Sequence, residues 1–231
     1  AWQNTEQYHS TLCIVNTTAA AFQLFQELKR NCTEDYNIYH LSNNMCPQHK
    51  LDTLEQIRKG LKDRQRKIIC VSTQLVEAGV NFSFGCVIRS KAGLDNVIQA
   101  AGRCNRHKEF AQLGAVYIVD ISKDVEKLDK LYEIAAAQQA LQKTLDDFDA
   151  NPEYFHQCLD SEQAVTVYYR NYQDQIRPNE TKFPVPEYDT TLVELLGKNK
   201  TGTSQYCRTH GMKKSETRIP QAFATAGKIF E

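Results

Sequence analysis

Five short apolar runs, separated by segments with helical spacing, constrain the fold of this chain more than any other feature. The runs are continuous rather than alternating, which is typical of strands buried on both faces of a parallel sheet. Alternating strands and helices predict an open α/β sheet, whose ligands gather at the carboxyl ends of the strands. We expect strands at Leu12–Val15, Ile38–Leu41, Ile68–Val71, Cys86–Ile88 and Ala115–Ile121, and helices at Ala19–Arg30, Lys50–Leu61 and Asn96–Cys104.

The character of the sequence changes after Ile121. Val125–Phe148 is rich in Ala, Gln and Leu and predicts one long helix, which Asn151 and Pro152 should end. Ser161–Gln175 favours another helix, and three prolines in Ile176–Asp189 indicate an irregular linker. We therefore expect an α/β domain over residues 1–122, a linker helix over 123–150 and a partly irregular C-terminal extension over 151–231. The chain has no initiator methionine and ends within an apolar stretch, so we expect a piece of a longer protein.

Composition sets limits on function. Hydrophobic residues make up 41% of the chain and charged residues 24%, which is an ordinary globular balance. The formal net charge is zero, which disfavours a stand-alone nucleic-acid binder but is compatible with one wall of a binding cleft. None of the eight cysteines forms a C-x-x-C pair, so we expect reduced cysteines and no metal site. No apolar run is long enough for a membrane span, and we expect a cytoplasmic protein without a membrane partner.

The strongest motif is QAAGRCNR, from Gln99 to Arg106. On a continuous helix, Gln99, Arg103 and Arg106 would share one face, and Gly102 would let a phosphate or another backbone come close. Two guanidinium groups on one face form a strong site for phosphate oxygens, such as those of a phosphoryl-transfer transition state. The alternative is an amphipathic helix whose end carries solvated arginines.

A second motif, Ser72–Phe84, directly follows the third predicted strand. Its first residues, Ser72 and Thr73, would lie where an open α/β sheet binds ligands, and their hydroxyl groups could hold a backbone phosphate. Gly79 would permit a tight turn near a nucleotide. The alternative is an ordinary connection between two strands.

These two motifs, in this order and spacing, resemble motifs V and VI of superfamily 2 helicases. The segment from Val71 to Arg106 more closely resembles the CRISPR-associated helicase–nuclease family of type I interference. Thr11–Leu28 resembles motif IV of that family, and Ile38–Lys50 resembles the segment after it. The resemblance implies that residues 1–122 form the second RecA-like domain of an ATP-dependent DNA helicase.

The resemblance also implies roles for individual residues. Arg106 would be the arginine finger, with Arg103 and Gln99 near the γ-phosphate of ATP. The cofactor-contacting residues would be Gly79, Asn81 and Gly102. The family usually has Asp where this chain has Asn81, which implies altered contact with the ribose. Single-stranded DNA would pass near Asn16, Thr17, Ser72 and Thr73.

The chain contains neither G-x-x-x-x-G-K-[ST] nor D-E-x-H, so it lacks the phosphate cradle and the magnesium-binding acid. ATP with Mg²⁺ would therefore be held mainly by a first RecA-like domain, which is not in this sequence. The other implied partners are single-stranded DNA, a nuclease domain of the same protein and the CRISPR surveillance complex. Two alternatives stay open: a non-catalytic helicase-like binding or docking module, and an RNA-directed superfamily 2 helicase.

Overall fold

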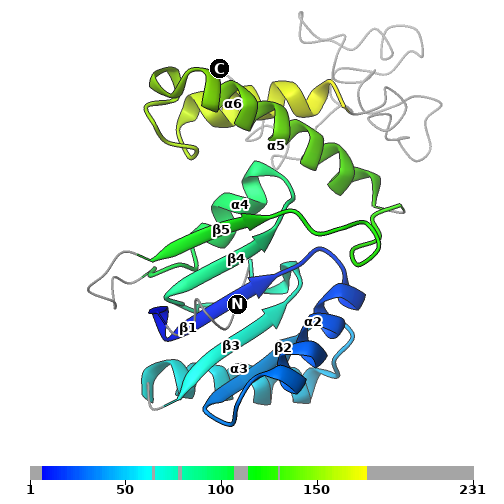
Figure 1. The fold of residues 1–231 in the computed structure, drawn as a ribbon, viewed down its shortest axis with the longest axis vertical. Helices are drawn as coiled ribbons and strands as arrows, with labels where there is room; N and C mark the ends of the chain where they lie inside the picture. The colour runs from blue at the N-terminus through cyan, green and yellow to red at the C-terminus, as the bar shows by residue number, and fades with distance from the viewer. Residues whose placement is uncertain (1–6, 64–65, 78–79, 107–113, 130, 176–231) are drawn as a thin grey trace, which may run out of the picture. The chain divides into compact units, whose positions relative to one another are not determined.

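The computed structural model describes residues 7–63, 66–77, 80–106, 114–129 and 131–175 (Figure 1). The chain divides into two compact units, residues 1–175 and 176–231. The second unit lies outside the described residues, as does the linker predicted at Ile176–Asp189. The description below concerns the first unit only.

Five parallel strands form one sheet in the order β2-β3-β1-β4-β5. The strands are β1 (Ser10–Ile14), β2 (Tyr36–Leu41), β3 (Lys67–Ser72), β4 (Cys86–Ser90) and β5 (Ala115–Val119). Each lies within two residues of its predicted bounds at both ends, and β1, β3 and most of β4 are buried. The prediction of an α/β fold with a parallel sheet is therefore confirmed, because continuous apolar runs belong to strands with two buried faces.

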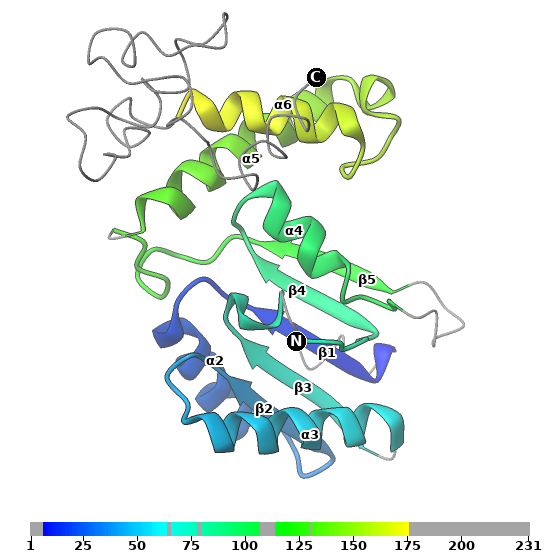
Figure 2. The same cartoon turned by 180° about the vertical axis from the view of Figure 1, so that it is seen from behind.

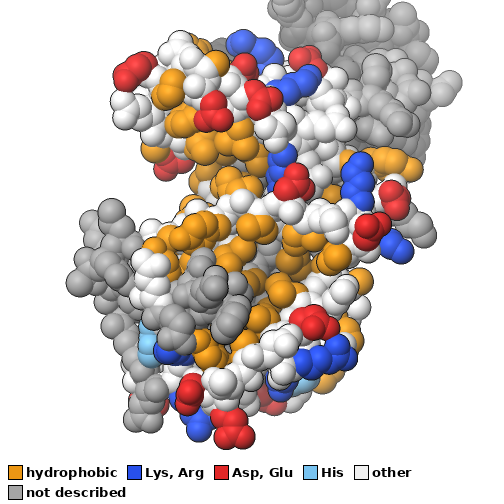
Figure 3. All heavy atoms as spheres, viewed as in Figure 1, with side chains coloured by type: hydrophobic (Ala, Val, Ile, Leu, Met, Phe, Trp, Pro, Cys, Tyr) orange, Lys and Arg blue, Asp and Glu red, His pale blue; other side chains and the backbone are white. Residues whose placement is uncertain are grey.

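Helices cover both faces of the sheet (Figures 1 and 2). Helix α2 (Thr18–Asn31) packs on one face, where Ala21 and Leu28 meet Ile69 and Val71. Helices α3 (Pro47–Asp63) and α4 (Leu94–Ala101) lie on the opposite face. Figure 3 shows the first face, on which hydrophobic side chains also gather beside α2.

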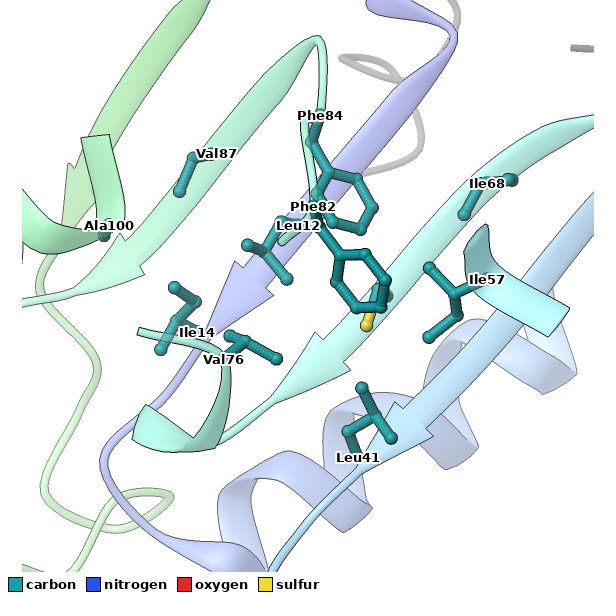
Figure 4. Packing of buried hydrophobic residues seen from close by; sticks show 11 residues of the cluster. Leu12, Ile14, Leu41, Ile57, Ile68, Val76, Phe82, Phe84, Val87 and Ala100 are labelled. Carbon is teal, nitrogen blue, oxygen red and sulfur yellow. The ribbon is translucent and has the colours of Figure 1, made fainter. Parts of the chain in front are cut away.

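The larger core lies under α3 and α4 (Figure 4). The fully buried Leu12, Ile14 and Ile68 point from the strands toward this layer. The rings of Phe82 and Phe84 meet edge to face, with centroids 5.9 Å apart. Both phenylalanines belong to the loop before β4, so this loop is fixed by burial of two aromatic side chains.

The segment after β5 departs from the sequence prediction. Helix α5 (Tyr132–Ala150) begins seven residues later than the expected start at Val125. The residues before it form turns instead, with the amides of Val125 and Glu126 both donating to the Ser122 carbonyl. Glu126 is only 2% exposed, because its carboxylate bonds to Asn16 in the loop after β1. A tertiary contact therefore replaces the first turns of the predicted helix.

Helices α5 and α6 (Glu162–Gln173) form a hairpin, with a 3₁₀ turn, η2 (Pro152–Phe155), between them. The hairpin packs on α4 through a cluster of Leu94, Val97, Leu141, Phe155 and Tyr168. The Tyr168 hydroxyl donates to Asp95 at 3.3 Å and leaves no space for a side chain at Gly93. The first compact unit thus reaches Gln175, beyond the boundary expected at residue 122, because α4 shares its core with the hairpin. None of the helices in the described ranges is both long and apolar enough to cross a bilayer.

Candidate nucleotide and nucleic-acid site

The arginine motif lies at the end of α4 rather than within it. The helix stops at Ala101, and Gly102 caps it with φ −62° and ψ −2°. The next residues pair with the loop before β4: Phe84 N donates to Arg103 O at 2.9 Å, and Asn105 N donates to Phe84 O at 2.8 Å. The prediction that Gln99, Arg103 and Arg106 share one helical face is therefore wrong, because backbone pairing with Phe84 ends the helix.

Arg103 is held by the loop that follows β3. It is 9% exposed, and its Nε donates to Val76 O at 2.9 Å while its Nη2 donates to Glu77 O at 2.7 Å. Both carbonyls lie at the end of the short 3₁₀ turn η1 (Gln74–Val76). Burial, and secondarily the neighbouring Arg106, lower the pKa of Arg103, and Glu77 opposes the shift.

Other residues of the predicted nucleotide site are exposed. Gln99, Gly102, Arg106 and Asn81 all lie at the surface, and Gly79 lies outside the described residues. A Cβ on Gly102 would meet only the carbonyl oxygens of Gln99 at 3.3 Å and Ile98 at 3.6 Å. Because φ is negative at Gly102, the backbone conformation at this position does not require glycine. An exposed glycine beside two arginines leaves room for a phosphate to approach.

The four residues predicted to face DNA are more enclosed than expected. The Ser72 hydroxyl is fully buried and donates to Leu41 O at 3.0 Å, and Thr73 is 4% exposed. The Asn16 side chain is also buried, and both its amide nitrogen and its oxygen are bonded inside the protein. Only Thr17 is half-buried, and its hydroxyl accepts from Ala20 N at 3.2 Å to cap α2. In this structure these side chains stabilise the loops at the carboxyl end of the sheet.

Sequence reasoning missed a buried ion pair at this edge. Arg89 Nε lies 2.7 Å from Glu77 Oε1, and the two side chains are 0% and 3% exposed. Burial raises the pKa of Glu77 despite the opposing effect of Arg89, and burial likewise lowers the pKa of Arg89 despite Glu77. One signal was present in the sequence: Arg89 directly follows the apolar run Cys86–Ile88 at the end of a buried strand, where a charge needs a partner.

Comparison with known proteins places this geometry in context. The family described as CRISPR-associated nuclease/helicase Cas3, C-terminal, matches residues 7–109, which include every predicted site residue. The Cas3 nuclease/helicase of Methanothermobacter thermautotrophicus is 22% identical over 233 residues, covering 96% of this chain and 27% of that protein. The chain resembles the C-terminal region of Cas3. The Cas3 of Haloferax volcanii is 41% identical over 66 residues, which is 29% of this chain and 7% of that protein.

Solved Cas3 structures have the same fold. The structure of T. fusca Cas3 with ATP superposes with a TM-score of 0.58 at 18% identity, covering 77% of this chain and 22% of that one. A chain of a CRISPR RNA-guided surveillance complex, in a pre-nicking state, superposes with a TM-score of 0.54 at 17% identity. The match covers 78% of this chain and 23% of that one. The described unit therefore has the RecA-like α/β fold of the Cas3 C-terminal helicase domain, and the chain spans about a quarter of these relatives.

Proposed function

We propose that this chain is the second motor domain of an ATP-dependent superfamily 2 DNA helicase that unwinds target DNA for degradation in CRISPR type I interference. The observation that carries the proposal is the pair of arginines at the end of α4. Arg103 is fixed by two backbone carbonyls, while Arg106, three residues later, is exposed. An anchored arginine beside an exposed one suits a domain that presents charge to a nucleotide held on a partner domain.

The nucleotide would be ATP with Mg²⁺, held mainly by a first RecA-like domain. Structures of T. fusca Cas3 with ADP, ATP and AMPPNP support nucleotide binding in similar proteins. Arg106 would reach the γ-phosphate as the arginine finger when the two domains close. Arg103 and Gln99 would line the same side of the cleft, and Gly102 would leave space for the phosphate. Gly79 and Asn81 would face the ribose.

Single-stranded DNA would cross the carboxyl end of the sheet. Because the side chains of Asn16, Ser72 and Thr73 are buried, we propose that they shape this track rather than bind phosphate with their side chains. Thr17 and the first amides of α2 would contact the phosphates, since helix N-termini favour anions. Further partners would be the nuclease domain of the same protein and the surveillance complex, which the similar chain in a pre-nicking complex supports.

A strand-displacement assay on the full-length protein tests this proposal. We expect it to separate a DNA duplex with a single-stranded overhang in the presence of ATP, and to fail with a non-hydrolysable analogue. Matched RNA duplexes provide the control for substrate class. Activity on RNA alone would indicate an RNA-directed helicase, and absence of ATP hydrolysis with any nucleic acid would indicate a docking module.

A further inference from the structure

A buried polar network joins five segments at the carboxyl end of the sheet. Arg89 Nη1, at the end of β4, donates to Asn16 Oδ1 at 2.7 Å and to Ser90 O at 2.7 Å. Its Nε pairs with the Glu77 carboxylate, whose other oxygen accepts from Asn96 at 3.1 Å. The network therefore connects the loop after β1, the loop after β3, the end of β4 and the start of α4.

A fifth segment, between β5 and α5, joins the network through Glu126. Its Oε1 accepts from Asn16 N at 2.6 Å. Its Oε2 accepts from Asn16 Nδ2 at 2.9 Å and from Ser90 Oγ at 2.6 Å. Three donors thus converge on one carboxylate that is 2% exposed. Asn16 is the central member, because it bonds both Glu126 and Arg89.

The network reaches the arginine motif through Glu77. The side chain of Glu77 pairs with Arg89, while its backbone carbonyl holds Arg103. A shift of the loop that contains Asn16 would therefore move Arg89, then Glu77, and so the group that orients Arg103. Buried ionic groups add little net stability compared with apolar residues of equal size, but a network of buried ion pairs and hydrogen bonds can specify a single arrangement.

We propose that Glu126 and Arg89 are positioning residues that couple the DNA track to the arginine motif by holding both on one rigid network. The inference rests on the proposed function, since it concerns transmission between the two sites of a helicase. Neither residue would touch DNA or nucleotide, because both side chains are buried. Glu126 also lies outside the segments that carry the family resemblance, whereas Arg89 lies within Val71–Arg106.

The test measures steady-state ATP hydrolysis by the full-length protein without DNA and with saturating single-stranded DNA. The ratio of the two rates is the DNA stimulation. Glu126→Gln keeps the shape of the side chain but replaces one acceptor oxygen with an NH₂ group, so one of three donors loses its partner. We expect the stimulation to fall about tenfold, the loss that one hydrogen bond to a charged group represents. Rescue by Glu126→Asp should be incomplete, because the shorter chain cannot reach all three donors.

Two further variants keep the test decisive. Ser90→Ala removes a single donor to the same carboxylate at little change in volume, and it should lower the stimulation in the same direction even if Glu126→Gln does not fold. Glu133→Gln changes an exposed glutamate in the first turn of α5 and should leave the stimulation unchanged. A merely structural defect would lower both hydrolysis rates together and leave their ratio as it was.

Each result has one interpretation. A wild-type ratio in folded Glu126→Gln or Ser90→Ala, with hydrolysis still abolished by Arg106→Ala, overturns the coupling role and leaves the proposed function in place. Absence of DNA stimulation in the wild-type protein would contradict both the coupling role and the proposed function. A selective fall of the ratio in the two network variants, and not in Glu133→Gln, supports the coupling role.

Discussion

Replacing Arg89 with Met should destabilise the protein strongly, because it leaves Glu77 as an unpaired charge in the interior. Arg89 is fully buried and lies 2.7 Å from the carboxylate of Glu77. Methionine fills a similar volume, so the loss is electrostatic rather than a cavity. Breaking one side of a buried ion pair costs about 3–5 kcal/mol. The substitution also removes the donor to two acceptors, Asn16 Oδ1 and Ser90 O. We therefore expect the free energy of unfolding to fall by about 4 kcal/mol.

The loss should depend on pH in a direction that the structure fixes. Burial already raises the pKa of Glu77 from its ordinary value of 4.5, and Arg89 opposes that shift. Without Arg89 the pKa of Glu77 rises further in the folded state. The protonated form of Glu77 is then favoured by folding and contributes to the stability of the variant at low pH. This contribution is lost as pH rises through the pKa of Glu77 in the folded state. The destabilisation should therefore be larger at pH 8 than at pH 5.5.

Urea denaturation of the wild type and Arg89→Met at these two pH values measures the effect. Arg58→Met, an exposed arginine on α3, should change the free energy of unfolding by less than about 0.5 kcal/mol. The double variant Arg89→Met/Glu77→Gln should lose less stability than the sum of its parts, because the stranded charge is gone. A loss below about 1 kcal/mol, or an equal loss at both pH values, would refute the argument.

Three further outcomes follow from the same structure. The chain alone should release phosphate from ATP more slowly than about 1 s⁻¹ with single-stranded DNA present, and faster turnover would contradict a separate nucleotide-holding domain. Its binding to unrelated oligonucleotides, followed by fluorescence anisotropy, should be weak, similar among sequences and reduced by salt, and tight sequence-specific binding would argue against a helicase. In peptide mapping after alkylation, the exposed Cys46 and Cys158 should react before the buried Cys13 and Cys70. Burial raises the pKa of Cys13 to about 12, which leaves little reactive thiolate. Equal labelling of all four cysteines would contradict the packing.

The strands were predictable because their signal is local. Buried parallel strands are typically continuous apolar runs, and such runs fill the interior of β3 (Ile68–Val71) and the end of β1 (Leu12–Ile14). Helix α2 was predictable for the same reason: Thr17 caps it, and its buried residues recur at helical spacing. The start of α5 was not predictable, because it depends on Glu126 bonding to a residue 110 positions earlier in the chain.

The site residues stay a prediction, but the structure arranges them differently from what the sequence indicated. The helical wheel placed Arg103 and Arg106 on one face with Gln99, yet Phe84 pairs with the backbone on both sides of Cys104 and ends the helix first. The polar character of Asn16 and Ser72 indicated exposure, whereas both are buried among internal partners. A sequence shows that a polar residue needs hydrogen bonds, but tertiary structure decides whether protein or ligand provides them.

The most direct test of the account is Arg106→Ala in the full-length protein, followed by single-turnover ATP hydrolysis and equilibrium binding of a non-hydrolysable ATP analogue. If Arg106 is the arginine finger, its guanidinium meets charge that develops only in the transition state. Hydrolysis should then slow by about three orders of magnitude or more, with little change in analogue binding. Arg106→Lys should not restore the rate, because an ammonium lacks the planar fork, and Arg58→Ala should match the wild type. A parallel fall in binding and hydrolysis, or no change in either, would contradict the assignment.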